Sequence, residues 1–252
     1  MSAGYRERFV KGEEAAHYDR VVYAPGTVSD VLWKVESKIL SNLVDEVRET
    51  HERMDYLDFA CGTGRIISFL EDKVDTATGI DVSQAMLDLA ADKVTDAALV
   101  CKDITSENDP IEAKYDLITA FRFMLNAEPS LRKAALRRLA MRLKGPDSVL
   151  LVNTHGNPVS HKALFLPYHW LRGALTGHKS NYITTRKAVA EIKEAGLEVE
   201  RIIGMGFISQ KLYTVFGSSL CLAIERHLAG TPLLQTFGVI QLYVCRLPCD
   251  HA

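Results

Sequence analysis

The sequence predicts an α/β fold in which helices cover both faces of a mostly parallel β-sheet. From about residue 54, short apolar runs alternate with segments whose apolar residues recur at helical intervals. This is the pattern of a chain that returns across its sheet between parallel strands. The run YDLITAF at 115–121 is nearly all apolar, as a parallel strand buried on both faces should be. Because no repeat, low-complexity segment or flexible linker interrupts the alternation, we expect residues 1–252 to form a single domain.

Seven apolar runs are predicted to be strands. They lie at 54–60, 76–82, 97–104, 115–121, 148–154, 197–204 and 239–247. Two regions fall outside the alternation, namely an N-terminal stretch at 1–50, expected to be a helical cap, and a segment at 155–183 rich in His, Tyr, Trp, Pro and Gly. We therefore expect a core at 54–154, an insertion after the fifth strand, and a C-terminal part at 184–252 that completes the sheet.

Four of the intervening segments have the spacing of amphipathic helices. They lie at 65–74, 83–94, 130–144 and 186–196. In the second, Met86, Leu89 and Ala90 are predicted to share the buried face, and GPD at 145–147 is predicted to stop the third. Capping residues are predicted at Ser83, Ser130, Thr184 or Thr185, and Gly196.

Composition narrows the classes of function. Apolar residues make up 47% of the 252 residues, enough for a sizeable core, and the net charge of −2 gives no bulk attraction to nucleic acid or anionic membranes. The N-terminus lacks the apolar core of a signal peptide, and the longest apolar stretch, 215–224, is about half of a membrane span. The five cysteines have no CxxC spacing, so they indicate neither a disulfide framework nor a zinc site. We expect a soluble cytoplasmic protein without a nucleic-acid partner or a transmembrane segment.

The stretch YLDFACGTGRIISFL at 56–70 places two glycines, Gly62 and Gly64, directly after the first strand. Such a turn lets the backbone approach a nucleotide-like ligand closely. A nicotinamide-binding loop has a third glycine three residues later, where this chain has Ile67. The phosphate-binding pattern GxxxxGK[ST] does not occur, so neither a pyrophosphate site nor a P-loop is favoured.

Acidic residues at the ends of the first three strands indicate which ligand fits. Asp58 precedes the glycine loop and would attract a cation, while Asp81 ends the second strand and can accept bonds from two ribose hydroxyls. Asp103 follows the third strand and can bond an adenine amino group, with Ile104 packed on the ring. A cationic ligand with a ribose and an adenine but no phosphates matches all of these residues. S-adenosylmethionine is such a molecule.

The motifs LDFACGTGR, GIDVSQAML, CKDI and YDLITAF resemble the class I S-adenosylmethionine-dependent methyltransferases over residues 54–154. The resemblance implies a three-layer sandwich around a seven-stranded sheet with the last strand antiparallel, and S-adenosylhomocysteine as the product of the cofactor. One departure is Ala60, where the family usually has its first glycine. Alanine is tolerated there if its φ stays negative. The residues expected to bind the cofactor on this basis are Asp58, Ala60, Cys61, Gly62, Gly64, Asp81, Val82, Met86, Asp103 and Ile104.

Three more residues are expected near the cofactor. Tyr18, in AAHYDRVV, resembles a contact from the N-terminal segment that folds over the cofactor in many relatives, although it could equally pin a helix onto the domain. Phe121 and Arg122 follow the fourth strand, where relatives line the floor between cofactor and substrate. A buried arginine needs a partner, and a carboxylate of the cofactor or of the acceptor would serve. Arg122 is therefore also a catalytic candidate.

Methyl transfer requires alignment of the acceptor with the methyl group, and a general base where the acceptor is a hydroxyl. His155 follows the fifth strand and is the candidate base. The segment 155–183 is a candidate substrate lid, although its aromatic residues could instead form a small core of their own. Candidate substrate contacts are Asn157, His161, Tyr168, His169 and Tyr182. Catechol-type relatives hold magnesium through acidic residues near the fourth and fifth strands. No metal is expected here, because Asp116 is expected to be structural and NTHGN after the fifth strand offers no carboxylate.

We expect a methyltransferase that acts on oxygen, on a small-molecule or sugar hydroxyl. A weaker resemblance of FRFMLNAEP and VNTHGN to methyltransferases of bacterial biosynthetic clusters favours a glycan or a secondary metabolite. The alternatives are N-methylation of a small amine and a non-catalytic module that binds S-adenosylmethionine, whereas Ile67 and Asp58 argue against a dehydrogenase. The segment 206–228 has few charges and could pack on the lid, line an apolar acceptor pocket or form a homodimer face.

Overall fold

The computed structural model describes residues 26–106, 109–160, 182–229 and 231–249. Their strands form one seven-stranded sheet in the order β3-β2-β1-β4-β5-β7-β6. The strands are β1 (Asp55–Phe59), β2 (Thr76–Asp81), β3 (Ala98–Cys101), β4 (Leu117–Ala120), β5 (Val149–His155), β6 (Glu198–Met205) and β7 (Ile240–Arg246). The first five are parallel, and β7 is antiparallel to both of its neighbours. The predicted sheet, with its last strand antiparallel, is confirmed.

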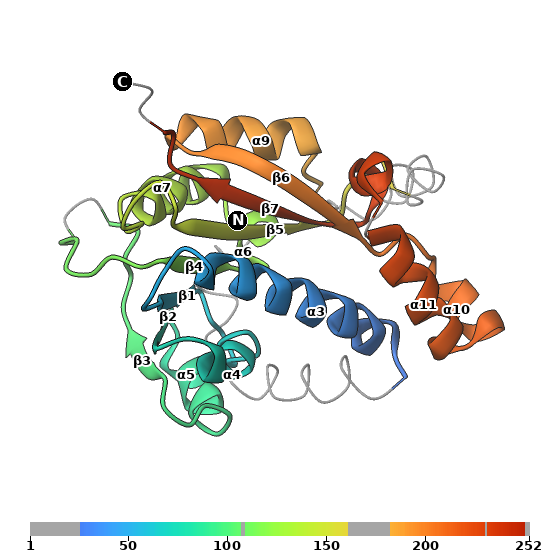
Figure 1. The fold of residues 1–252 in the computed structure, drawn as a ribbon, viewed down its shortest axis with the longest axis horizontal. Coiled ribbons are helices and arrows are strands. Elements are labelled where there is room, and N and C mark those ends of the chain that lie inside the picture. Colours follow the sequence, from blue (N-terminus) through green and yellow to red (C-terminus); the bar gives the residue numbers. More distant parts are fainter. Residues whose placement is uncertain (1–25, 107–108, 161–181, 230, 250–252) are drawn as a thin grey trace, which may run out of the picture.

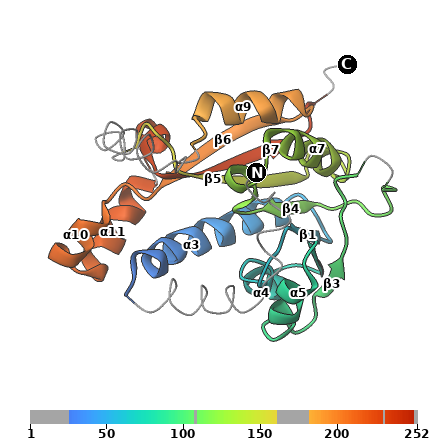
Figure 2. The same cartoon turned by 180° about the vertical axis from the view of Figure 1, so that it is seen from behind.

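Helices form a layer on each face of this sheet (Figure 1, and from behind in Figure 2). One face packs against α6 (Phe123–Asn126), α7 (Pro129–Ala140) and α9 (Thr185–Glu194). The other packs against α3 (Val28–Arg48), the short helix α4 (Ile67–Leu70) and the end of α11 (Ser218–Ala229). Further elements are η1 (Glu71–Lys73), α5 (Gln84–Ala91), α10 (Gln210–Phe216) and η3 (Pro232–Phe237).

Alternation along the strands explains the two layers. Leu57 of β1 and Ile118 of β4 point into the core beneath α7, whereas Tyr56 and Leu117 belong to the core beneath α3. All four side chains are buried. Consecutive strand residues face opposite sides of a sheet, so a strand covered on both sides is mostly apolar along its whole length. For this reason YDLITAF was recognisable as a central strand.

Local capping agrees with the sequence at two helices and differs at a third. Ser83 accepts a hydrogen bond from the Met86 amide and Thr184 accepts one from the Lys187 amide, as N-caps do. The prediction that Ser130 caps the third helix is wrong, because α7 begins at Pro129, a residue whose fixed φ suits the first helical position. That helix also ends at Ala140, well before the GPD sequence.

Two further predictions about helices need correction. The helix expected at 65–74 contains only the four residues of α4 before the chain tightens into η1, whose Lys73 carbonyl accepts a bond from Arg48 instead of continuing the helix. In α5 the buried residues are Met86, Leu87 and Ala90, so Leu87 takes the place expected for Leu89.

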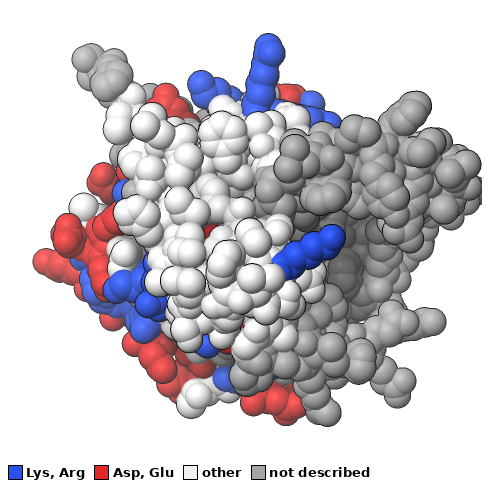
Figure 3. Space-filling model, turned by 90° about the vertical axis from the view of Figure 1, so that its right-hand side faces the viewer, with Lys and Arg blue, Asp and Glu red and all other residues white. Residues whose placement is uncertain are grey.

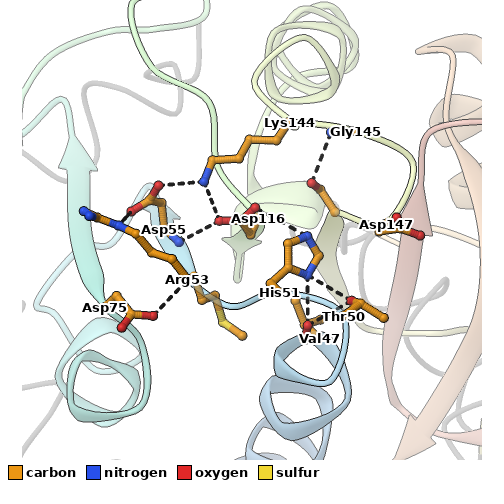
Figure 4. Close-up of polar contacts among 12 residues, drawn as sticks. Val47, Thr50, His51, Arg53, Asp55, Asp75, Asp116, Lys144, Gly145 and Asp147 are labelled. Atoms are coloured by element: carbon orange, nitrogen blue, oxygen red, sulfur yellow. Dashed lines mark hydrogen bonds and ion pairs between the residues drawn. The ribbon is translucent and has the colours of Figure 1, made fainter.

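A charged cluster closes the edge of the sheet where β1 and β4 begin (Figure 4). The Lys144 ammonium lies 2.6 Å from a carboxylate oxygen of Asp55 and 2.6 Å from one of Asp116. His51 faces the second oxygen of Asp116 at 3.4 Å. Because this cluster lies at the amino ends of parallel strands, it belongs to the edge opposite the one where ligands bind in such sheets.

Candidate active site

The turn from β1 to α4 has an unusual backbone. Ala60, Gly62 and Gly64 have φ values of 54°, 55° and 78°, all in the left-handed region. The Gly64 amide donates to the Cys61 carbonyl and the Cys61 amide to the Ile80 carbonyl, which fastens the turn to β2. A Cβ atom on Gly64 would lie 2.8 Å from the Ala90 side chain, so a glycine is needed there for both conformation and space.

Ala60 does not meet the condition under which alanine replaces glycine without cost, because its φ is positive. A left-handed alanine costs roughly 1–2 kcal/mol, because its Cβ crowds the following carbonyl. The loop therefore accommodates alanine in place of glycine at the cost of local backbone strain.

Asp58 lies beneath this loop. Its side chain is 1% exposed, and its two oxygens accept hydrogen bonds from the Thr119 hydroxyl at 2.7 Å and the Ile67 amide at 3.2 Å. Burial raises the pKa of Asp58 to about 7. The carboxyl group therefore connects β1 and β4 to the first turn of α4, and it supports the loop from the interior.

A pocket opens beside the loop at the carboxyl ends of β1 and β2, the edge where ligands bind in such sheets. Its lining combines Asp81 and Asp103 with apolar side chains. The described residues that line it are Phe59, Ala60, Ile80, Asp81, Val82, Lys102, Asp103, Thr105, Phe123 and Leu131. The structure thus brings together the residues expected to bind the ribose and the adenine.

The two acids of the pocket are held by hydrogen bonds. One oxygen of Asp81 accepts from the Gly62 amide and the other from the Ser83 amide, both at 2.9 Å. Burial raises the pKa of Asp81. Each carboxylate oxygen has a further lone pair, so Asp81 can still accept from two hydroxyl groups. Asp103 is fixed by Thr105, whose amide and hydroxyl both donate to its Oδ1 atom.

Several pocket residues were not predicted from the sequence. Phe59 and Phe123 meet edge to face with their ring centroids 5.0 Å apart and form one wall. Lys102 also lines the pocket, with its ammonium 2.6 Å from Asp109. Phe59 could have been predicted from the sequence, because it directly precedes the glycine loop. Phe123 and Leu131 could not, because they follow β4 and reach the pocket only through the packing of α6 and α7.

The other cofactor candidates in the described part of the chain do not line this pocket. Ile104 is buried, and Met86 lies in the first turn of α5. Cys61 is buried in the loop, and burial raises the pKa of its thiol well above the usual range. Phe121 is buried at the end of β4, and Arg122, half-buried, has a φ of 58° at the start of α6. Tyr18 lies outside the described residues.

The acceptor side is described only in part. His155 is half-buried and ends β5 in a pair with Ile240. Asn157 is fully buried, and its side-chain amide donates to the carbonyls of Thr236 and Gly238. We therefore no longer expect it to contact an acceptor. Tyr182 is exposed before α9, and the remaining candidates, His161, Tyr168 and His169, lie outside the described residues.

Most of the segment 206–228 forms two consecutive helices, α10 and α11. Tyr213 and Cys221 pack against Val31 of α3, while an apolar row faces outward: Leu212, Val215, Phe216, Leu220 and Ile224. Figure 3 shows this end of the molecule, where few charged side chains interrupt the surface. In the described part of the chain these helices do not line the pocket at Asp81.

Two features of the described residues bear on metals and membranes. No three His, Cys, Asp or Glu side chains there gather as metal ligands would, and the expectation of a metal-free site stays a prediction. Within the same residues, no helix is both long enough and apolar enough to cross a membrane.

Comparison with known proteins identifies the family. A family model described as a methyltransferase domain matches residues 33–202. Malonyl-[acyl-carrier protein] O-methyltransferases from Acetivibrio thermocellus and Priestia megaterium are 30% and 31% identical over 136 and 137 residues, each 51% of this chain. These segments are 45% and 47% of those proteins, so the chain spans about half the length of the curated relatives it matches.

A solved structure extends the likeness to the whole fold. Magnesium protoporphyrin IX methyltransferase from Synechocystis, determined with bound S-adenosylhomocysteine, superposes with a TM-score of 0.63 over 96% of this chain and 97% of its own, at 14% identity. The matched domain, the strand order and the glycine-loop pocket agree, and the chain belongs to the class I S-adenosylmethionine-dependent methyltransferases.

Proposed function

We propose that this methyltransferase transfers a methyl group to an oxygen atom of a small-molecule or glycan acceptor. The observation that carries the choice of oxygen is the likeness to two curated relatives that are both named O-methyltransferases. Those relatives are named for a malonyl group on a carrier protein, which has a free carboxylate. A carboxylate is therefore a second kind of acceptor to test beside hydroxyl groups.

The pocket residues have the chemistry to hold the cofactor. Asp81 would accept from the ribose hydroxyls, and Asp103 with Ile104 would receive the adenine. The left-handed turn of the glycine loop, with Gly62 and Gly64, would let the backbone lie close to the rest of the molecule. When bound, S-adenosylmethionine supplies an activated methyl on its sulfonium. The remaining tasks of the chain are to align the acceptor and to exclude water.

The two kinds of oxygen acceptor make different demands on the chain. A hydroxyl must lose its proton, and His155, at the end of β5, is our candidate for the general base. A carboxylate is already ionised near neutral pH and needs no base. In that case a cation that orients it matters more, and Arg122 is the candidate.

The first experiment tests the cofactor. Titration calorimetry with S-adenosylmethionine, S-adenosylhomocysteine and NAD should give micromolar binding of the first two and none of the third. Asp81→Ala should weaken binding at least tenfold, because it removes the hydroxyl acceptors and frees the Gly62 amide. Asp88→Ala is the matched control, since Asp88 lies on α5 with an exposed side chain that accepts from the exposed Gln84. Folded wild-type protein that binds neither sulfur compound would remove the basis for the proposal.

The second experiment identifies the atom that is methylated. Incubation with S-adenosylmethionine carrying a labelled methyl group, and with malonyl thioesters, sugars or small amines, should label an oxygen acceptor. A methyl ester releases labelled methanol in mild base, whereas a methyl ether does not, so the product separates carboxylate from hydroxyl transfer. Label on an amine would favour the N-methyltransferase alternative, and tight cofactor binding without transfer to any acceptor would favour a non-catalytic binding module.

Location and assembly are also proposals. A reducing compartment such as the cytoplasm fits five cysteines that are all free in the structure. The outward apolar row on α10 and α11 gives a surface through which two copies could pair. Sedimentation analysis tests that homodimer directly.

A further inference from the structure

A chain of buried polar side chains runs beneath the active-site edge of the sheet. Asn153 of β5 and Glu36 of α3 are 2% and 5% exposed. The Asn153 amide nitrogen donates to Glu36 Oε1 at 3.5 Å, and Arg65 donates to Glu36 Oε2 at 2.8 Å. At the other end, the Arg122 backbone amide donates to Asn153 Oδ1 at 2.6 Å. Four segments distant in sequence therefore meet through these contacts.

Each end of this polar chain holds a turn beside the cofactor pocket. Arg122 has a left-handed φ of 58°, a conformation that a non-glycine residue keeps only when its surroundings impose it. The next residue, Phe123, forms a wall of the pocket. Arg65 directly follows Gly64 of the glycine loop, and its guanidinium lies 4.5 Å from the ring centre of Trp33 on α3.

The direction of the hydrogen bonds explains why these residue types are needed. Asn153 must accept from Arg122 on one side and donate to Glu36 on the other, which an amide can do. Glu36 must accept at both of its oxygens, from Asn153 and from Arg65, which only a carboxylate can do. A buried polar network stabilises a structure only when all of its members are satisfied, so a change at either position leaves one contact with two donors or two acceptors.

We propose that Asn153 and Glu36 are positioning residues for the cofactor site, an inference that rests on the function proposed above. Together they fix the turn at Arg122 and the exit of the glycine loop relative to α3. The glycine loop and the side of the pocket formed by Phe123 then keep their separation before the cofactor binds. Loss of this connection should weaken cofactor binding in protein that is still folded.

Two isosteric variants and their combination test the proposal. Asn153→Asp sets a second carboxylate against Glu36, and Glu36→Gln sets an amide donor against that of Asn153. In the double variant the new amide at position 36 donates to the new carboxylate at position 153. Arg65 and the Arg122 amide keep their acceptors. Only a role that depends on this hydrogen-bond pattern predicts rescue in the double variant.

The measurement is the affinity for S-adenosylhomocysteine by titration calorimetry, at a temperature where urea unfolding shows each variant to be folded. We expect each single variant to bind at least tenfold more weakly than wild type, and the double variant to bind within threefold of wild type. Glu46→Gln is the matched control, because Glu46 lies on the same helix with an exposed side chain paired to Arg201. It should bind as wild type does.

Failure of this inference differs from failure of the proposed function. Wild-type protein that does not bind S-adenosylhomocysteine would overturn the proposed function itself. If wild type binds, single variants that are folded and retain full affinity would show that Asn153 and Glu36 serve stability alone. A double variant that fails to fold, or that binds more than threefold more weakly than wild type, would also overturn the inference, whether or not the single variants fold.

Discussion

Asp58 shows how a single buried side chain makes the fold sensitive to pH. Its oxygens accept from Thr119 and Ile67, yet desolvation outweighs these bonds and raises the pKa of Asp58 to about 7. An acid whose pKa is higher in the folded state than in the unfolded state prefers to be neutral in the folded protein. Its neutral form therefore adds its full share to the free energy of unfolding below about pH 4, and this share is lost as the pH rises through 7.

The variant Asp58→Asn should remove this dependence. An amide can accept from Ile67 and donate to Thr119, whose hydroxyl then donates to Tyr56, so the contacts are kept without the charge. The free energy of unfolding of wild type, relative to the variant, should fall by at most about 4 kcal/mol between pH 4 and 8. Urea unfolding across that range measures it, with the exposed Asp88→Asn as control. Equal slopes in wild type and both variants would contradict the prediction.

At the scale of residues, the sequence predicts chemistry better than conformation. Asp81, Asp103 and the two glycines could be placed because a strand end followed by a turn is visible in the pattern. The left-handed φ of Ala60 could not be predicted, because it follows from bonds that fasten the loop to β2. The burial of Glu36 could have been predicted, because Glu36 precedes Leu40, Leu43 and Val47 on one face of α3. A carboxylate buried on that face needs a partner.

At the scale of elements, charged pairs connect helices and strands that are distant in the sequence. Arg132 of α7 and Glu191 of α9 are both buried and share two hydrogen bonds of 2.8 and 2.9 Å. Lys144, just beyond α7, joins the starts of β1 and β4 through Asp55 and Asp116 (Figure 4). The hydrogen bond from Lys144 is the main reason that the pKa of Asp55 is lowered to about 2.

Replacement of Lys144 by methionine should therefore destabilise the protein in a pH-dependent way. A lowered carboxyl pKa contributes stability above about pH 4 that is lost as the pH falls toward 2. We expect Lys144→Met to cost about 2 kcal/mol at pH 7, because it leaves the buried Asp116 without its ammonium partner, and less at pH 2. Thermal or urea unfolding at both pH values measures this.

A second lysine provides the control for this prediction. Lys133 pairs with Glu194, and both side chains are more than 40% exposed. Such surface pairs contribute less than about 1 kcal/mol, so Lys133→Met should change little at either pH. An equal loss in the two variants would mean that the cluster at the start of β1 and β4 has no special role.

Elements with strong periodicity were predicted, and short ones were not. All seven strands were expected, because each is an apolar run between turn residues. The four-residue helix α6 is too short to leave a periodic pattern, and α4 was predicted only as part of a longer helix at 65–74. Their ends depend on tertiary contacts, such as the bond from Arg48 to Lys73 and the bond from the Arg122 amide to Asn153.

At the scale of the whole molecule, we propose that the described chain unfolds as one cooperative domain. The seven strands form one continuous sheet, and Tyr243 of β7 belongs to the same apolar core as Leu57 of β1. A ligand bound beside β1 and β2 should then protect β6 and β7 as well, although those strands lie on the far side of the sheet.

Hydrogen exchange tests this cooperativity. S-adenosylhomocysteine at about 100 times its dissociation constant should add about 2.7 kcal/mol to the free energy of unfolding. The slowest amides of β1 and of β7 should both exchange about 100-fold more slowly. Slowing confined to the β3–β2–β1–β4 half would instead indicate two units that open independently.

The position of β7 in the sheet has a consequence for synthesis on the ribosome. This strand comes after β5 and β6 in the chain, yet it lies between them, and among the described strands β6 pairs with β7 alone. While β7 is still being translated, the apolar strand β5 has one open edge, and β6 has nowhere to dock. An open apolar edge invites pairing with other chains. We therefore expect the nascent protein to be most prone to pairing with other chains before β7 is in place.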